Sequence, residues 1–371
     1  MFIKKIYLKN FRNFDEILIN LNKNLNIFIG KNGQGKTNLL ESIYLLATAS
    51  SHRTNIDSEM IKWDKESSII QVILYKKEDE IKLSLIFEGS RKIIKINENP
   101  LTRISDLVGN INVVLFSPED LQLVKGGPFY RRKFLDVEVS QVSTYYHHLL
   151  KKYEHILKQR NNLLKDIRER RDSKKESMLD IWDKQLVDIG TKVVKKRLEV
   201  VEKLKILARL AQRQITDGNE NLNIEYEFSF NGKVEKDKVN FIFNNNLVNN
   251  RNREIKRGYT LFGPHRDDLI LKINGMDVRK YGSQGQQRTV ALALKMAELE
   301  FMKSETGEYP LLLLDDVFSE LDNERKNKLL DIISDKIQTI ITTTDLKDFK
   351  SFKLDLIKLF RVVGGKIIER R

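Results

Sequence analysis

A glycine-rich segment near the N-terminus has residue types suited to binding phosphate. Its residues fit the pattern G-x-x-x-x-G-K-[ST] and are Gly30, Lys31, Asn32, Gly33, Gln34, Gly35, Lys36 and Thr37. An apolar, strand-like run precedes them and helical spacing follows, as in a phosphate loop. Glycines let backbone amides converge on phosphate oxygens, the Lys36 ammonium adds a cation, and the Thr37 hydroxyl suits Mg²⁺. The segment predicts a site for ATP and Mg²⁺; the alternative is a glycine turn that fits the pattern by chance.

A second candidate site follows a wholly apolar run in the C-terminal third. Residues 311–314 are four leucines, and the two carboxylates of Asp315 and Asp316 come directly after them. Such a run is typical of a parallel strand buried on both faces, and strands of this kind bring an acid to the metal of a phosphate site. We expect Asp315 to hold Mg²⁺ and Asp316 to orient or deprotonate the attacking water. The alternative is a core strand that ends in a solvated turn.

A third polar segment precedes a predicted helix. Residues 283–287, Ser-Gln-Gly-Gln-Gln, begin 32 residues before Asp315, and amides at a helix N-terminus favour an anion. The segment resembles the LSGGQ signature of ABC-type ATPases, with glutamines at positions 284 and 286 as departures from the transporter form. The resemblance implies that Ser283, Gly285 and Gln286 bind the γ-phosphate held by another subunit, so that the site is completed in an ATP-dependent homodimer.

Further segments have counterparts in the same family. Residues 319–322, Ser-Glu-Leu-Asp, are similar to the D-loop, which crosses the dimer interface. Residues 342–345 stand where transporters carry a switch histidine. The resemblance implies that Thr344 or Asp345 takes that role here. It also implies that Arg12 approaches the nucleotide phosphates, with a surface arginine in a turn as the alternative. Residues 118–120 stand at the joint between lobes where the family senses Mg²⁺, although no single residue there replaces the usual glutamine.

The layout of the chain separates the branches of this family. Lys36 and Ser283 are 247 residues apart, which is more than the helical insert of a transporter subunit uses and too little for a long coiled coil. Over its whole length the chain resembles the RecF family, in the DNA-repair and chromosome-organising, SMC-like branch. The segments that carry this resemblance are 11–14 (FRNF), 30–37, 116–120 (FSPED), 131–136 (RRKFLD), 263–268 (GPHRDD), 283–286 (SQGQ) and 314–316 (LDD).

This resemblance implies an ATP-dependent DNA-binding protein of replication and recombinational repair. An ATP-driven dimer would clamp duplex DNA or a gap junction and, with RecO- and RecR-type mediators, promote RecA loading after DNA damage in the SOS response. Weak, DNA-stimulated ATP hydrolysis, with Lys36 and Asp316 as catalytic residues, would reset the clamp in the cytoplasm.

Three alternatives belong to other functional classes. A transporter-type ABC ATPase subunit is disfavoured by the long insert and the missing switch histidine. A nuclease-fused ATPase of the overcoming-lysogenisation type needs an additional acidic metal-binding domain, for which the chain has no room. A nucleotide-gated DNA clamp with negligible turnover differs from the main interpretation only in rate, and the sequence leaves it open.

Two polar segments outside the nucleotide motifs have both a functional and a structural interpretation. Arg131, Arg132 and Lys133 are candidate contacts to DNA phosphates, yet the following Phe-Leu-Asp also suits a helix tied to its lobe. Residues 263–268 form a tight polar turn that serves either as a structural corner or as a contact at the nucleotide interface. Within it, His265 has no partner ligands nearby in the sequence, which argues against a metal site.

Composition sets the broad class. The 371 residues carry a formal net charge of +14 and a pI near 9.5, which favours polyanionic partners, although basic surfaces also arise without such partners. Cysteine is absent, which excludes disulfides, thiolate metal sites and cysteine nucleophiles. No apolar run approaches the roughly 20 residues that cross a bilayer, so we expect no membrane partner and a cytosolic setting.

The periodicity along the chain predicts an α/β fold with an inserted, mainly helical lobe. We expect lobe I at residues 1–117 and 258–371 and lobe II at residues 118–257, together an ABC-type ATPase head. Expected strands are 3–8, 15–21, 25–29, 69–75, 81–88, 309–314 and 338–343, with helices at 37–49 and 323–333. Helical spacing fills residues 118–218, and the charged stretch 158–177 reads as a helix end and turn. Residues 222–257 are Asn-rich and strand-like without clear periodicity.

Overall fold

The computed structural model describes residues 1–77, 79–89, 91–170, 176–230, 235–319, 321–332, 336–349 and 357–370. The chain divides into two units, one from Met1–Asp120 with Lys295–Arg371 and one from Leu121–Leu294. The second boundary therefore differs from the expected one at residues 257/258. The physical reason is strand pairing, because β10 (Asp268–Ile273) pairs along its length with β9 (Leu222–Glu227) inside the second unit.

A six-stranded sheet in the first unit carries the candidate nucleotide motifs. Its strands are β3 (Leu25–Ile29), β8 (Val113–Phe116), β12 (Leu311–Asp315), β13 (Thr339–Thr343), β14 (Ile357–Val363) and β15 (Lys366–Arg370), in the order β15-β14-β3-β13-β12-β8. All neighbouring pairs are parallel except β14 with β15. The leucines of β12 are buried, as expected for a central parallel strand. Parallel strands end at one edge, so the ends of β3, β12 and β13 lie together.

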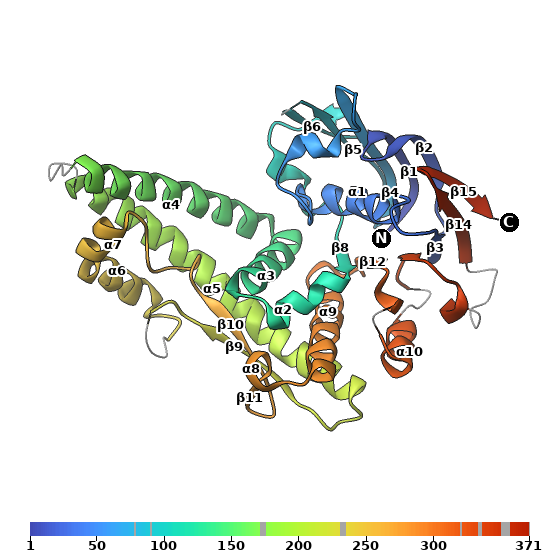
Figure 1. The fold of residues 1–371 in the computed structure, drawn as a ribbon. Helices are drawn as coiled ribbons and strands as arrows, with labels where there is room; N and C mark the ends of the chain where they lie inside the picture. Colours follow the sequence, from blue (N-terminus) through green and yellow to red (C-terminus); the bar gives the residue numbers. More distant parts are fainter. Residues whose placement is uncertain are drawn as a thin grey trace. The chain divides into compact units, whose positions relative to one another are not determined.

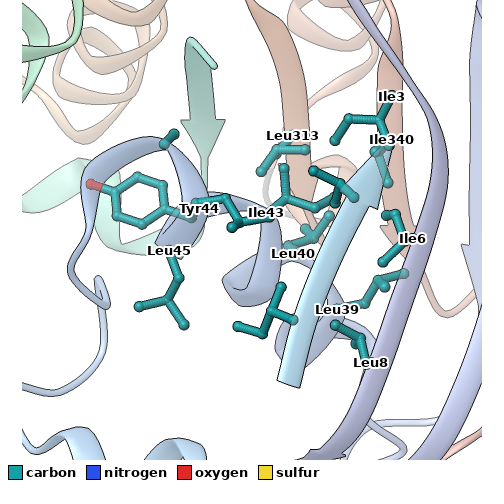
Figure 2. Packing of buried hydrophobic residues seen from close by; sticks show 14 of the residues in the cluster. Ile3, Ile6, Leu8, Leu39, Leu40, Ile43, Tyr44, Leu45, Leu313 and Ile340 are labelled. Atoms are coloured by element: carbon teal, nitrogen blue, oxygen red, sulfur yellow. The ribbon is translucent and has the colours of Figure 1, made fainter. Parts of the chain in front are cut away.

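An antiparallel sheet completes the first unit. Its strands are β1 (Phe2–Phe11), β2 (Phe14–Asn20), β4 (Ser67–Lys76), β5 (Asp79–Glu88), β6 (Arg91–Ile96) and β7 (Asn99–Pro100), in the order β2-β1-β4-β5-β6-β7. Helix α1 (Lys36–Thr48) contributes apolar side chains to one core with residues of both sheets (Figure 2). A helix packed on several sides needs apolar residues around most of its circumference, and Leu39, Leu40, Ile43 and Leu46 are all buried.

Shorter elements connect these layers. They are η1 (Asp57–Met60), η2 (Ile104–Leu107), η3 (Pro118–Leu121), η5 (Val317–Ser319), α10 (Asn323–Ile332) and η6 (Lys347–Phe349). The strands and helices expected in residues 1–88 and 309–343 are confirmed with small shifts of their ends, and residue 333 of the expected last helix lies outside the described residues.

The second unit is mainly helical (Figure 1). It contains α2 (Gln122–Lys125), α3 (Pro128–Val142), α4 (Thr144–Arg170), α5 (Glu176–Ile215), α6 (Val239–Asn249), α7 (Arg251–Arg257) and α8 (Val278–Tyr281). The sheet β11-β10-β9, with β11 at Met276–Asp277, completes it, and α9 (Gln284–Thr306) begins in this unit and ends in the first. The helical prediction for residues 118–218 is confirmed, and residues 171–175 of the charged stretch lie outside the described residues.

The strand-like interpretation of residues 222–257 is wrong for most of the stretch. Only Leu222–Glu227 forms a strand, and two helices, α6 and α7, follow. Asparagine is a weak helix former, so propensity hid α6. Val239, Phe243 and Leu247 are fully buried at four-residue spacing, and this apolar face packs α6 against α5.

Candidate nucleotide site

The phosphate loop connects the end of β3 with the start of α1. Gly33 and Gly35 have φ angles of 78° and 112°, which glycine adopts without strain. Inside the loop the Lys36 ammonium donates to the carbonyl oxygens of Gly30 at 2.7 Å and Lys31 at 3.1 Å, and it lies 3.5 Å from Asn32 Oδ1. Burial lowers the pKa of Lys36, although the nearby carboxylates oppose this shift. The predicted lysine therefore lies at the centre of its loop.

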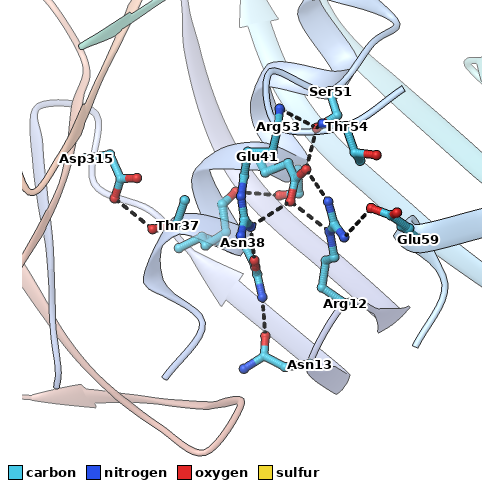
Figure 3. Close-up of polar contacts among 12 residues, drawn as sticks. Arg12, Asn13, Thr37, Asn38, Glu41, Ser51, Arg53, Thr54, Glu59 and Asp315 are labelled. Carbon is cyan, nitrogen blue, oxygen red and sulfur yellow. Dashed lines mark hydrogen bonds and ion pairs between the residues drawn. The ribbon is translucent and has the colours of Figure 1, made fainter. Parts of the chain in front are cut away.

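The two predicted metal ligands lie side by side. Thr37 Oγ1, in the first turn of α1, donates to Asp315 Oδ1 at the end of β12 over 3.1 Å (Figure 3). Hydroxyl and carboxylate oxygens are the donors that Mg²⁺ prefers. Among the described residues no group of three or more His, Cys, Asp or Glu could hold a metal. Thr37 and Asp315 are therefore the residues that would hold Mg²⁺, which would supply positive charge beside the phosphates.

Thr342 of β13 joins both acidic residues, a role that the sequence did not reveal. Its Oγ1 donates to Asp315 Oδ1 over 2.6 Å and accepts the Asp316 amide at 3.2 Å, and its carbonyl also accepts that amide at 3.1 Å. Asp316 has a φ angle of 51°, which is uncommon for a residue other than glycine and which these backbone contacts hold in place. The pairing register of β12 with β13 is the signal that places Thr342 beside Asp315.

Arg12 is engaged with carboxylates in this structure. Its Nε and Nη2 donate to the two carboxylate oxygens of Glu41 on α1 at 2.9 and 2.7 Å, and Nη1 lies 3.6 Å from Glu59 (Figure 3). Burial acts to raise the pKa of Glu41, but hydrogen bonds from Arg12 and Ser51 outweigh it and the pKa is lowered. Arg12 therefore anchors α1 here, and its contact with phosphate stays a prediction.

The signature segment caps helix α9 in the second unit. Ser283 Oγ accepts the Gln286 amide at 3.1 Å, while Gln286 Oε1 accepts the Ser283 amide at 2.9 Å. This reciprocal pair is a capping box, so Gln286, which departs from the transporter signature, has a local structural role. Gln286 Nε2 also donates to Glu220 at 2.9 Å. Ser283 and Gln284 are exposed, which leaves the N-terminal end of a 23-residue helix accessible.

Three other family segments are the D-loop, the switch position and the segment at residues 118–120. Glu320 of the D-loop lies outside the described residues, while Ser319 Oγ donates to the Asp316 carbonyl at 2.7 Å. Thr344 and Asp345, the candidates for the switch position, are exposed just after β13. In the segment at residues 118–120, burial raises the pKa of Asp120 to about 6, although Lys295 opposes the shift.

The basic run at residues 131–133 does not act as one surface patch. Arg131 is 4% exposed, and its Nε and Nη2 each lie 2.8 Å from an oxygen of Asp268. This corrects the expectation for Arg131, because its guanidinium is occupied inside the second unit. Arg132 is half-buried and donates to the Asp267 carbonyl at 2.7 Å. Lys133 is exposed, and its contact with DNA stays a prediction.

The turn at residues 263–268 is held by contacts within the second unit. Asp267 accepts the Tyr226 hydroxyl at 2.6 Å and the Ser229 amide at 2.7 Å. His265 Nδ1 lies 2.7 Å from the Tyr153 hydroxyl, and burial lowers the pKa of His265 to about 3. These contacts fit the structural-corner interpretation, in which the imidazole is neutral. Separately, no described helix is both long and apolar enough to span a bilayer.

Comparisons with known proteins agree over the whole chain. The family model described as RecF/RecN/SMC N terminal domain matches residues 2–367. The DNA replication and repair protein RecF of Halothermothrix orenii is 57% identical over 370 residues, covering 99% of this chain and 98% of the relative. The RecF protein of Alkaliphilus oremlandii is 45% identical over 371 residues, covering 99% and 100%.

Solved structures give the same assignment. The recombination mediator protein RecF-ATPrS in the RecFOR pathway has a TM-score of 0.92 at 36% identity, covering 100% of this chain and 98% of that one. The Smc head domain derived from Pyrococcus furiosus has a TM-score of 0.55 at 16% identity, covering 100% and 96%, and this likeness concerns the fold alone. The fold is therefore that of an ABC-type, SMC-like ATPase head, and the transporter interpretation no longer applies. The chain belongs to the RecF family.

Proposed function

We propose that this chain is an ATP-dependent DNA-binding protein of replication and recombinational repair whose ATP site is completed by a second copy. The observation that carries the proposal is the pairing of Thr37 with Asp315 beside a phosphate loop that surrounds Lys36. The start of α9 is capped by Ser283 and remains exposed, so it is a second candidate site for an anion. The names of the relatives, DNA replication and repair protein RecF and RecF-ATP, support the same function.

In this proposal the loop amides and Lys36 bind the ATP phosphates. Lys36 exchanges its contacts with the loop carbonyls for phosphate oxygens, which is favourable because burial strengthens the attraction between opposite charges. Thr37 and Asp315 hold Mg²⁺, whose charge offsets that of the phosphates when it is bound. Asp316 orients or deprotonates the attacking water, and Thr342 keeps the backbone of this residue in place.

The second copy contributes its signature segment. Ser283, Gly285 and Gln286 at the start of its α9 would face the γ-phosphate, where a helix N-terminus favours negative charge. ATP would then join the two copies, and hydrolysis would release them, because the attraction depends on the charge of the terminal phosphate.

Charge supports DNA as the partner and points to the second unit. Residues 121–294 contain 35 of the 66 Lys and Arg residues but only 22 of the 52 Asp and Glu residues, a difference of 13 within a total net charge of +14. An excess of cations attracts nucleic acid by neutralising phosphates and releasing counterions. We therefore place the contact with DNA mainly on this unit, with Lys133 as one of the residues that take part.

The finer cellular role follows from family resemblance. We propose clamping at gaps, cooperation with RecO- and RecR-type mediators in loading RecA, a cytoplasmic location, and weak hydrolysis that DNA stimulates. The name of the solved relative, which refers to the RecFOR pathway, supports this setting. A nucleotide-gated clamp with negligible turnover is the second candidate. Phosphate release with and without gapped DNA separates the two, since only the first predicts a rate that DNA raises.

Sedimentation velocity tests the proposal. Wild type and Ser283→Asp are compared with ATP, with ADP and without nucleotide, and the same samples are tested for binding to duplex DNA. Aspartate is as good a helix cap as serine, so α9 is preserved while a negative charge opposes the partner's phosphate. We expect ATP to dimerise wild type and to tighten DNA binding, and the variant to stay monomeric. A monomeric wild type at saturating ATP, or DNA binding that ignores ATP, contradicts the proposal.

A further inference from the structure

Two segments from opposite ends of the chain form hydrogen bonds to the phosphate loop at Gln34. The Gln34 carbonyl accepts a hydrogen bond from Asn13 Nδ2 at 2.9 Å and a second from the Gly365 amide at 3.2 Å. The Gln34 side chain accepts the Gly364 amide at 2.7 Å. Asn13 lies between β1 and β2, and residues 364 and 365 form the turn between β14 and β15. Both segments therefore hold the loop at a single residue, Gln34.

The three segments pack so closely that glycine is required where they meet. A Cβ atom on Gly35 would lie 2.6 Å from Asn13 Nδ2. A Cβ atom on Gly365 would fall closer than 3.0 Å to the Asn13 carbonyl oxygen, and one on Gly30 equally close to the carbonyl oxygen of Val362 on β14. These are contacts with backbone or with a tethered amide, which cannot give way as a long side chain could. The three segments therefore have little room to move relative to one another.

Asn13 also connects the loop to α1. Its Oδ1 accepts Asn38 Nδ2 at 2.8 Å, and Asn38 Oδ1 accepts Arg53 Nη1 at 2.7 Å (Figure 3). The single side chain of Asn13 thus fixes the Gln34 carbonyl on one side and the first turns of the helix on the other. Both contacts are made between groups of the protein alone.

The fixed carbonyl determines where the neighbouring amide points. The peptide between Gln34 and Gly35 is planar and trans, so the Gly35 N–H points away from the side to which the Gln34 carbonyl is held. Loops of this type bind phosphate through amides that converge on it. Because Asn13 and Gly365 hold the Gln34 carbonyl on their side of the loop, the amide of Gly35 points to the opposite side.

We propose that Asn13 and the turn at residues 364–365 are positioning residues of the ATP site, which preorient the Gln34–Gly35 peptide for phosphate. This inference rests on the proposed ATP-binding function. Neither segment touches ATP in this proposal, and both act through the loop. Preorganised dipoles need no reorientation when the ligand arrives, and the affinity for ATP is higher for this reason. Binding is reciprocal, so ATP should in turn stabilise the turn between β14 and β15.

Two neighbouring glycines provide a matched pair of variants. Gly364 and Gly365 both have positive φ angles, 54° and 73°, so alanine strains the backbone similarly at either position. Only at residue 365 does the added methyl group meet the Asn13 carbonyl, because nothing lies within 4 Å of it at residue 364. We expect Gly365→Ala to weaken ATP binding about ten- to a hundredfold relative to Gly364→Ala, since small misplacements cost factors of this size.

Asn13→Asp tests the hydrogen bond without changing size. Aspartate still accepts from Asn38, but it has no N–H for the Gln34 carbonyl and brings two oxygens together. We expect a lower melting temperature in the absence of nucleotide and, in addition, weaker ATP binding by protein that is still fully folded. A purely structural role would lower the melting temperature of Asn13→Asp and Gly365→Ala but leave the ATP affinity of the folded protein unchanged. That result would overturn the proposal.

Hydrogen exchange on the wild-type protein provides a test that needs no variant. We expect ATP to slow amide exchange at residues 364 and 365, and unchanged exchange there despite saturating ATP would overturn the proposal. Wild-type ATP affinity of Gly365→Ala would do the same. The proposed function is judged separately, by whether wild type binds ATP at all and Lys36→Ala loses that binding.

Discussion

Replacing Arg131 distinguishes a buried structural pair from a contact with DNA. The Arg131 guanidinium makes two 2.8 Å contacts with Asp268 and also donates to the carbonyls of Leu123 at 3.2 Å and Gly126 at 2.9 Å. Arg131→Ala leaves the Asp268 carboxylate buried without its partner. Breaking a buried pair in this way costs about 3–5 kcal/mol. In a unit of this size, about 2–4 °C per kcal/mol gives a drop in melting temperature of roughly 6–20 °C.

Thermal unfolding measured by calorimetry checks this expectation, with Lys133→Ala as the control. Lys133 is exposed on the same helix, so its removal should change stability by less than about 0.5 kcal/mol. We expect the control to weaken DNA binding in a salt-dependent way, since one phosphate contact is lost. If Arg131→Ala melts like wild type and loses DNA binding, the structural role of Arg131 is refuted, because the guanidinium would then contact DNA rather than stabilise the fold.

Three further outcomes are expected. Asp316→Asn should retain ATP binding while phosphate release slows about a hundredfold or more, and unchanged release would remove Asp316 from the chemistry. Thr342→Val should weaken Mg²⁺-dependent ATP binding, measured by titration with and without Mg²⁺, because Asp315 loses the donor at 2.6 Å. Burial lowers the pKa of His265 to about 3 and of His147 to about 4, below the usual 6.5. Below about pH 6.5 the unfolded state therefore binds more protons than the folded state, so the free energy of unfolding falls as the pH drops toward 4. Urea unfolding at pH 7 and pH 5 should show this loss of stability, and His265→Gln should make the loss smaller.

Motifs that are local in sequence were predictable here. The phosphate loop and the acidic end of β12 each lie within eight consecutive residues, and their side chains meet because parallel strands end at a common edge. The capping role of Gln286 was also readable, since Ser-x-x-Gln before a helix is a capping box. The likeness to the signature by itself gives no sign of this capping role.

Contacts between distant segments were not predictable. The burial of Arg131 depends on Asp268, which lies 137 residues further along the chain, and a basic run alone gives no sign of such a partner. The role of Asn13 requires the loop, α1 and the last hairpin to be placed together. Helix α6 was missed because its asparagines mask an apolar spacing of only three side chains.

ATP hydrolysis by mixed copies tests most directly whether the site is shared between two chains. Lys36→Ala disables the phosphate loop, and Ser283→Asp disables the signature, so neither variant alone should hydrolyse ATP. In a mixed dimer, the loop of the Ser283→Asp copy faces the intact signature of the Lys36→Ala copy. An equal mixture should regain activity, at most about half of the wild-type rate, because a mixed dimer has one intact site where the wild-type dimer has two. A mixture no more active than its separate components would contradict the shared site, as would full activity of Ser283→Asp alone.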